Sequence, residues 1–202
     1  EMPVQYTSII EEHKNTRENI GLFDVSHMGE VFIKGSQSVE YLESIVPQNL
    51  RTLEKGKAIY CQLPNKNGGL IDDLIIYNVK GIIDDIDYLI VINASRIDVD
   101  VPFMQEMAKG LDVEVINKSD DFSMLALQGP NAKYIIEKMG IELDNQPKFF
   151  TIISTKLENG NAITLEDGML KLEFGKQKKD SLTKNIELGL FENKNGAKVS
   201  VS

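Results

Sequence analysis

The chain has 202 residues, of which 22 are basic and 31 acidic, so its formal net charge is −9. This excess of negative charge disfavours nucleic-acid binding, because phosphates would be repelled unless basic residues were tightly clustered, and the sequence has no such cluster. A single cysteine excludes a disulfide framework and a cysteine-based zinc site. The apolar runs are only strand-sized and residues 1–4 lack signal-peptide features, so we expect no membrane span and a cytoplasmic or organelle-matrix protein.

Residues 8–139 alternate between helical and strand patterns. A first helix is expected to begin at the cap Ser8, to use Glu11 in a capping box and to stop near Gly21. The other expected helices cover residues 39–46, 95–110 and 131–139, and the expected strands cover 29–35, 57–63, 69–79, 87–94, 113–116 and 122–128. The sequence Asn67-Gly68-Gly69 between two apolar runs predicts a β-hairpin.

The pattern changes after about residue 146, where helical spacing ends. Short strands are expected at residues 149–157, 162–165, 170–174, 186–191 and 199–201. We therefore predict an α+β fold of antiparallel sheets with packed helices over residues 1–155, followed by a short β-rich segment over residues 156–202. About fifty residues bury little core of their own, so this segment must pack on the first part.

Two adjacent carboxylates, Asp72 and Asp73, interrupt an apolar strand. Because side chains alternate along a strand, the two point to opposite faces of the sheet. An ionised carboxylate costs several kcal/mol to bury unless hydrogen bonds or a ligand compensate, so one of the pair is a candidate to face a ligand. The alternative is a bulge or strand end with both groups in solvent, and parity alone does not identify the ligand-facing residue.

Two further features have structural as well as functional interpretations. Tyr60 and Cys61 in one expected strand and Tyr77 in the next could stack on a flat ligand, or could simply be residues of the sheet. The segment 23–30 contains Asp24, Ser26 and His27, which favour a hydrogen-bonded turn over a catalytic triad because no nucleophile-elbow motif accompanies them.

Several of these segments occur in an order that resembles one known family. They are Gly21-Leu22-Phe23-Asp24-Val25-Ser26-His27-Met28-Gly29-Glu30, Gly56-Lys57-Ala58-Ile59-Tyr60, Gly69-Leu70-Ile71-Asp72-Asp73-Leu74, Val91-Ile92-Asn93-Ala94-Ser95 and Ala126-Leu127-Gln128-Gly129-Pro130. Together they resemble the N-terminal part of aminomethyltransferase, the T-protein of the glycine cleavage system, over roughly residues 2–155.

The resemblance implies a tetrahydrofolate-binding fold and an enzymatic reaction. In this reaction the aminomethyl group on the lipoyl arm of the H-protein is split, ammonia leaves, and tetrahydrofolate accepts the one-carbon unit. The first Asp of the family's Ile-Asp-Asp motif falls on Asp72, which would hold and activate the reacting pterin nitrogen. The resemblance also implies folate-pocket contacts for Met28, Tyr60, Leu74, Tyr77, Val91 and Asn93.

The sequence also departs from the family pattern. A Thr-Gly-Tyr-Thr-Gly-Glu motif and an arginine-containing segment that contribute to folate binding are absent, whereas residues 181–190 and 196–201 resemble C-terminal barrel strands. The expected explanation is a family chain that lacks a large interior stretch. The alternatives are a non-catalytic folate-binding or assembly module of the same superfamily, a related folate-dependent demethylase or oxidase domain, and a scaffold without a ligand. A monomer is expected.

Overall fold

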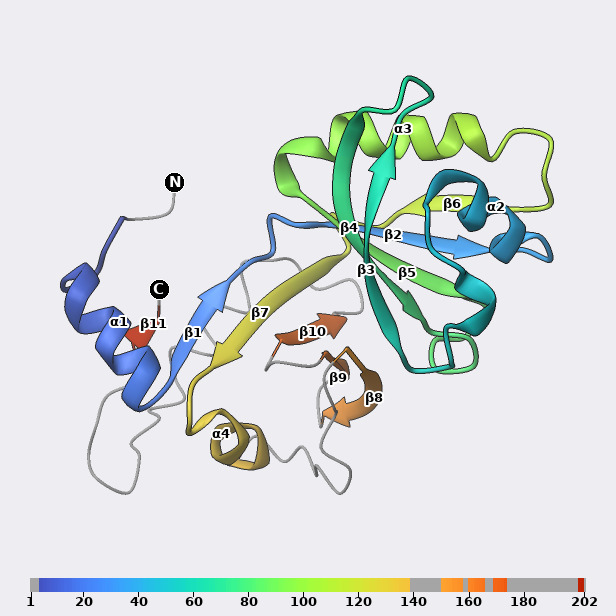
Figure 1. Ribbon diagram of the computed structural model, residues 1–202. Helices are drawn as coiled ribbons and strands as arrows, with labels where there is room; N and C mark the ends of the chain where they lie inside the picture. Colours follow the sequence, from blue (N-terminus) through green and yellow to red (C-terminus); the bar gives the residue numbers. More distant parts are fainter. Residues whose placement is uncertain (1–3, 139–149, 158–159, 166–168, 174–199, 202) are drawn as a thin grey trace. The chain divides into compact units, whose positions relative to one another are not determined.

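The computed structural model describes residues 4–138, 150–157, 160–165, 169–173 and 200–201 (Figure 1). The chain forms two compact units, the first from residues 1–25, 123–147 and 155–202 and the second from residues 26–122 and 148–154. Helices accompany antiparallel strands in both units, which confirms the predicted α+β class. Among the helices of the described ranges, none has the length and apolarity needed to cross a membrane.

The second unit is built on a five-stranded sheet with the strand order β3-β4-β5-β2-β6, and each neighbouring pair in it is antiparallel. Its strands are β2 (Gly29–Lys34), β3 (Ala58–Pro64), β4 (Leu70–Asn78), β5 (Tyr88–Ile92) and β6 (Glu114–Asn117). All five residues of the central β5 are buried, as its unbroken apolar run requires. The five strands predicted between residues 29 and 116 are thereby confirmed.

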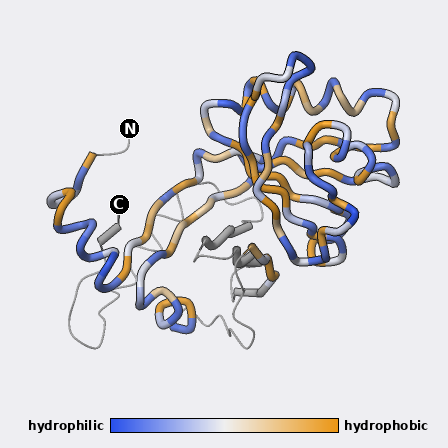
Figure 2. The backbone as a smooth tube through the Cα atoms, viewed as in Figure 1, coloured by the Kyte–Doolittle hydropathy of each residue, from blue (hydrophilic) through white to orange (hydrophobic). Residues whose placement is uncertain are grey.

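Two helices, α2 (Ser38–Ile45) and α3 (Ile97–Met107), pack on one face of this sheet (Figure 1). Apolar residues recur at helical spacing on both helices, and Figure 2 shows apolar segments along the strands beneath them. We call this side the helix-covered face; its sheet residues include Val31, Leu63, Leu74, Ile90 and Ile92. Two short 3₁₀ helices, η1 (Leu50–Thr52) and η2 (Ala94–Arg96), follow α2 and β5 respectively.

The turn between β3 and β4 is the predicted hairpin. The backbone N–H of Asn65 donates to the carbonyl of Gly69 at 2.8 Å, and the Asn65 side chain accepts hydrogen bonds from the N–H groups of Asn67 and Gly69. Gly68 has φ of 81°, a conformation that glycine adopts without steric cost. This turn fixes the register between β3 and β4, and therefore the direction in which each side chain of β4 points.

A six-stranded sheet with the order β11-β1-β7-β10-β9-β8 belongs mostly to the first unit, while Phe122 of β7 and residues 152–154 of β8 are assigned to the second. The elements of this unit and sheet are α1 (Ile9–Glu18), β1 (Gly21–Asp24), β7 (Phe122–Gln128), α4 (Ala132–Lys138), β8 (Ile152–Leu157), β9 (Gly160–Leu165), β10 (Met169–Glu173) and β11 (Ser200–Val201). These elements confirm the strands predicted near residues 122–128, 149–157, 162–165, 170–174 and 199–201 and the helix predicted at 131–139. The strand predicted at 186–191 and most of the β-rich segment 156–202 lie outside the described residues.

The N-terminal helix corrects two details of the prediction. Ser8 does cap α1 by accepting from the N–H of Glu11 at 3.2 Å, but it is Glu12, not Glu11, whose carboxylate accepts backbone N–H groups before the helix. The helix ends at Glu18, and Gly21 opens β1, a strand that the sequence patterns did not predict. A Cβ at position 21 would lie 2.6 Å from the hydroxyl of Thr16 and 2.8 Å from the ring of Phe23, so a larger residue there would force these side chains to shift.

Candidate functional site

The register of the sheet determines where Asp72 and Asp73 point. Asp72 pairs with Leu63, and both Leu63 and Leu74 are buried in the helix-covered core, so Asp72 lies on that face near the start of β4. Asp73 points to the opposite face of the sheet. The parity that the sequence left open is thus resolved: Asp72, the candidate catalytic residue, lies on the face that α3 covers.

Asn93 joins the two carboxylates. It follows the last residue of β5, which pairs with β4, so its side chain lies beside residues 72 and 73. The Asn93 amide nitrogen lies 2.9 Å from Oδ1 of Asp72, 3.1 Å from Oδ1 of Asp73 and 3.1 Å from the Asp73 carbonyl. The backbone N–H of Asn93 also donates to Oδ2 of Asp72 at 3.4 Å. A residue expected only as a pocket contact therefore orients the candidate catalytic carboxylate.

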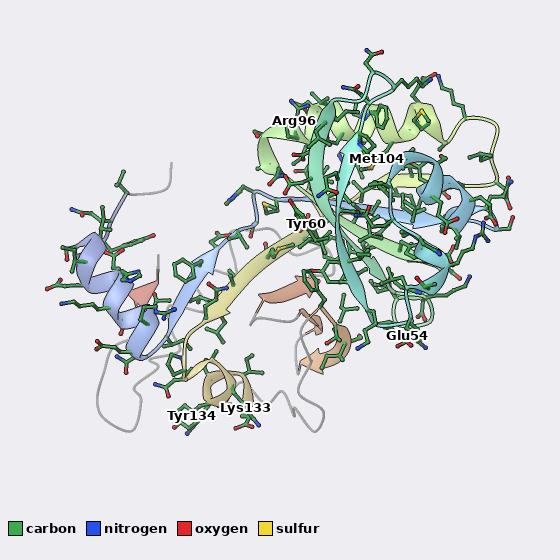
Figure 3. The ribbon with its side chains drawn as sticks, in the orientation of Figure 1. Glu54, Tyr60, Arg96, Met104, Lys133 and Tyr134 are labelled. Carbon is green, nitrogen blue, oxygen red and sulfur yellow. The ribbon has the colours of Figure 1, made fainter. Side chains whose placement is uncertain are left out.

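A third carboxyl, Asp100, completes this cluster and was not predicted. Its side chain, in the first turn of α3, is fully buried near Asp72, and neither of its carboxyl oxygens has a hydrogen-bond partner among the described residues. The available signal was helical spacing, because Asp100 lies on the same stripe as Met104 and Ala108, which are both buried. Figure 3 labels Met104 on this helix and Arg96 immediately before it.

The surroundings shift the pKa values of Asp72 and Asp100 in opposite directions. Burial, followed by the neighbouring Asp72 carboxyl and its negative charge, raises the pKa of Asp100 to about 7, with the charge of Arg96 acting against the rise. Burial would also raise the pKa of Asp72, but the neighbouring Asp100 carboxyl together with hydrogen bonds from the Asn93 side chain and from backbone N–H groups outweighs burial and lowers that pKa. At neutral pH Asp72 is therefore the ionised member of the pair.

The remaining predicted contacts do not all lie beside Asp72. Tyr60, labelled on β3 in Figure 3, is 47 % exposed and donates a 2.6 Å hydrogen bond from its hydroxyl to Asp73 on the other face. This hydrogen bond, with smaller effects of burial and charge, raises the pKa of Tyr60. Tyr77 and Val91 are buried on the same face as Tyr60, as the strand register shows.

Leu74, Met28 and Cys61 lie in three different surroundings. Leu74 is 2 % exposed within the core, so its side chain contacts other core residues. Met28 is half-buried in the turn between β1 and β2. Cys61 is fully buried on the helix-covered face, and burial raises the pKa of its thiol to about 12, which excludes a reactive thiolate at neutral pH.

An open cavity of about 700 Å³ lies elsewhere on the second unit, and Asp72 is not among its lining residues. Its lining comes from three segments, residues 34–35, 80–87 and 111–114. Both lysines of the lining are paired with carboxylates, Lys34 with Glu114 at 2.7 Å and Lys80 with Asp87 at 3.2 Å, and Asp84, Asp85 and Asp112 add further negative charge to it. In the described part of the chain, no group of three or more His, Cys, Asp or Glu side chains is arranged to hold a metal ion.

The fold and site together define an α+β protein whose five-stranded sheet carries a partly buried carboxylate, Asp72, oriented by Asn93. A family model described as the GCVT N-terminal domain matches residues 1–166, and the chain belongs to that family. The resemblance to the aminomethyltransferase family that the sequence motifs indicated is thereby confirmed.

Individual relatives agree with this assignment. The chain is 42% identical over 168 residues to the aminomethyltransferase of Halothermothrix orenii and 43% identical over 160 residues to that of Bacillus mycoides, covering 83% and 79% of this chain. These matches cover only 45% and 42% of the relatives, so the chain spans less than half of their length.

Two solved structures extend the comparison. The glycine cleavage system aminomethyltransferase T from Bartonella henselae superposes with a TM-score of 0.78 at 25% identity, over 93% of this chain and 51% of that protein. The heterotetrameric sarcosine oxidase from Corynebacterium sp. U-96 shares the fold, with a TM-score of 0.55 at 15% identity, over 76% of this chain and 74% of that one.

Proposed function

We propose that this chain is a tetrahydrofolate-dependent aminomethyltransferase of the glycine cleavage system. In the proposed reaction, a methylene unit passes from the aminomethyl-lipoyl group of the H-protein to tetrahydrofolate, and ammonia is released. Family membership supports the reaction class. The observation that carries the proposal is Asp72, an ionised carboxylate at the edge of an apolar core, oriented by Asn93.

The chemistry of the residues present fits a reduced pterin. Tetrahydrofolate offers ring N–H groups, and an anionic carboxylate is an acceptor for them, so Asp72 would hold the pterin and move a proton at its reacting nitrogen. When bound, tetrahydrofolate supplies the nucleophilic nitrogens that take up the one-carbon unit. Asn93 would keep the Asp72 carboxylate in one orientation. Met28, Tyr60, Leu74, Tyr77 and Val91 remain proposed contacts.

The test is an assay of methylene transfer from aminomethyl-loaded H-protein to tetrahydrofolate with the full chain. Asp72→Asn is expected to reduce the rate more than about a hundredfold, the range for a positioned acid–base group. Asp98→Asn is the matched control. Asp98 is an exposed residue of α3, and its substitution removes the same charge from the same unit.

Each outcome of this assay has a definite meaning. Equal rates in the two variants would refute a catalytic role for Asp72. Saturable tetrahydrofolate binding by the wild-type chain without transfer would replace the proposal by the non-catalytic folate-binding module. Transfer from N-methylated amines in place of loaded H-protein would assign the chain to the demethylase or oxidase relatives.

A further inference from the structure

The turn between β3 and β4 contains two asparagines whose side chains are held very differently. The side-chain oxygen of Asn65 accepts hydrogen bonds from the backbone N–H of Asn67 at 2.9 Å and from that of Gly69 at 3.1 Å. The side chain of Asn67 is exposed and makes no hydrogen bond within the described residues. The turn therefore fixes the carboxamide of Asn65 and leaves that of Asn67 free to rotate.

The residue that follows Asn67 leaves its carboxamide open to attack. Among the described asparagines, Asn67 is the only one followed directly by a glycine. Gly68 has φ of 81°, and a Cβ built on it would meet no atom within 4 Å. Because glycine has no side chain, the Asn67 carboxamide can approach the Gly68 nitrogen without a steric clash. Two reactive groups that adjoin in one chain have a high effective concentration when they can align.

We propose that Asn67 is a site of spontaneous chemical modification, at which the exposed turn converts an asparagine into aspartate and isoaspartate. In the first step the backbone nitrogen of Gly68 attacks the side-chain carbonyl carbon of Asn67. A bond forms between this nitrogen and Cγ, the bond between Cγ and Nδ2 breaks, and ammonia leaves with the proton of the Gly68 N–H. The product is a five-membered succinimide ring, and no atom is oxidised or reduced.

Solvent water completes the reaction. Water adds to one of the two carbonyl carbons of the ring and breaks the bond between that carbon and the nitrogen. Opening at Cγ restores the ordinary backbone and leaves aspartate at position 67. Opening at the backbone carbonyl carbon leaves an isoaspartyl linkage, in which the main chain runs through Cγ and is longer by one methylene. Both products add one negative charge to the turn.

One hydrogen bond of the native turn opposes the attack. The Gly68 N–H donates to the Asn65 carbonyl at 3.1 Å, and this bond must open before the nitrogen can reach Cγ. Residues 66–70 are all exposed, so local opening of the turn uncovers no core and water can replace the lost partner. The native turn is therefore expected to slow the conversion relative to the unfolded chain without preventing it.

The isoaspartyl product would disturb the hairpin where its register is set. The extra methylene lies between residues 67 and 68, inside the loop that the 2.8 Å hydrogen bond from the Asn65 N–H to the Gly69 carbonyl closes. The register of β3 against β4 depends on this closure, and β4 carries Asp72. The modification thus acts on the strand that bears the candidate site, but the proposal requires no catalytic role for Asp72.

The test is incubation of the purified full chain in H₂¹⁸O at pH 8 and 37 °C, followed by digestion in ordinary water and mass spectrometry of the peptides. The ¹⁸O label separates conversion during the incubation from conversion before or after it. We expect Asn67 to convert at least about tenfold faster than Asn65, whose side chain is held and which precedes a lysine. Isoaspartate in the peptide is detected by enzymatic methylation with an isoaspartate methyltransferase. The Asn-Gly pairs at 159–160 and 195–196, whose asparagines lie outside the described residues, are distinguished by their own peptides.

Asn67→Gln is the matched variant, because it keeps a carboxamide at this position but would have to close a six-membered ring. It is expected to lower conversion at position 67 by at least about tenfold, since the longer side chain aligns less readily with the nitrogen. In ¹H–¹⁵N NMR spectra, the aged wild type is expected to show a second set of amide signals for Asn65 and Gly69, and aged Asn67→Gln a single set.

Two results would overturn the proposal. One is equal conversion of Asn67 and Asn65 in the folded wild type. The other is a folded wild type that takes up no label at position 67 while a sample unfolded in urea is labelled there. Circular dichroism checks that Asn67→Gln folds, and if it does not, the comparison of Asn67 with Asn65 within the wild-type chain still decides.

Discussion

The stability of this protein should depend on pH through a buried carboxyl, that of Asp100. Its folded-state pKa is about 7, against an ordinary value of 3.8, so between these pH values the folded chain binds a proton that the unfolded chain has lost. The stability contributed by this proton is complete below pH 3.8 and is lost as the pH rises through about 7. Asp72, with a lowered pKa, contributes stability that is present above pH 3.8 and lost only as the pH falls below it. The window from pH 5 to 8 therefore reports on Asp100 alone within this pair.

The size of the effect follows from the pKa difference. Each pKa unit corresponds to roughly 1.4 kcal/mol, so the rise from pH 5 to 8 is expected to remove about 3 kcal/mol from the free energy of unfolding. Asp100→Asn keeps the shape of the side chain but cannot ionise. It is expected to match the wild type near pH 5 and to be more stable by about 3 kcal/mol at pH 8.

The assay is urea unfolding, followed by circular dichroism at pH 5, 6, 7 and 8. The exposed Asp98→Asn is the control, because it changes the net charge equally and is expected to follow the wild type across the series. The reasoning would be refuted if the difference in unfolding free energy between Asp100→Asn and the wild type were the same at pH 5 and pH 8.

Two further predictions concern backbone space and thiol reactivity. Gly35 and Gly110 both have positive φ, at 137° and 83°, but a Cβ on Gly35 would collide with the backbone at Asp112 while one on Gly110 would meet no atom within 4 Å. Gly35→Ala is therefore expected to lower the free energy of unfolding by at least about 1 kcal/mol more than Gly110→Ala, and equal losses in urea titrations would contradict the described turn. Cys61 is fully buried, and burial raises the pKa of its thiol to about 12. We therefore expect no reaction with a thiol reagent at pH 8 in the native protein, and one reactive thiol per chain once urea unfolds it. Rapid labelling of the native protein would show that Cys61 is not buried.

Local patterns were sufficient to predict most helices and strands. The buried strand β5 is an unbroken apolar run, and the hairpin between β3 and β4 is marked by turn residues, so both could be read without tertiary information. The strand β1 was missed because it has only four residues and runs directly into the turn that contains Ser26. Its pairing with β7 is a long-range interaction that short sequence windows do not contain.

In the candidate site, too, local patterns predicted only part of the structure, and the rest depends on contacts between residues far apart in the sequence. Alternation along β4 predicted that Asp72 and Asp73 point to opposite faces, but only the register with β3 identifies Asp72 as the residue under α3. Asn93, which donates to Asp72, and the buried Asp100 are 21 and 28 positions from Asp72 in the sequence, so no local pattern brings them to the site. Asp100 also occupies a buried helical position that usually holds an apolar side chain, which conceals it in a pattern of apolar spacing.

The most direct measurement is the ratio of methylene-transfer rates of the Asp72→Asn and Asp98→Asn chains, assayed together with loaded H-protein and tetrahydrofolate. If Asp72 is the carboxylate that acts on the pterin, the ratio falls below about one hundredth. A ratio near one, with wild-type transfer intact, would show that the reaction does not depend on the Asp72 carboxylate.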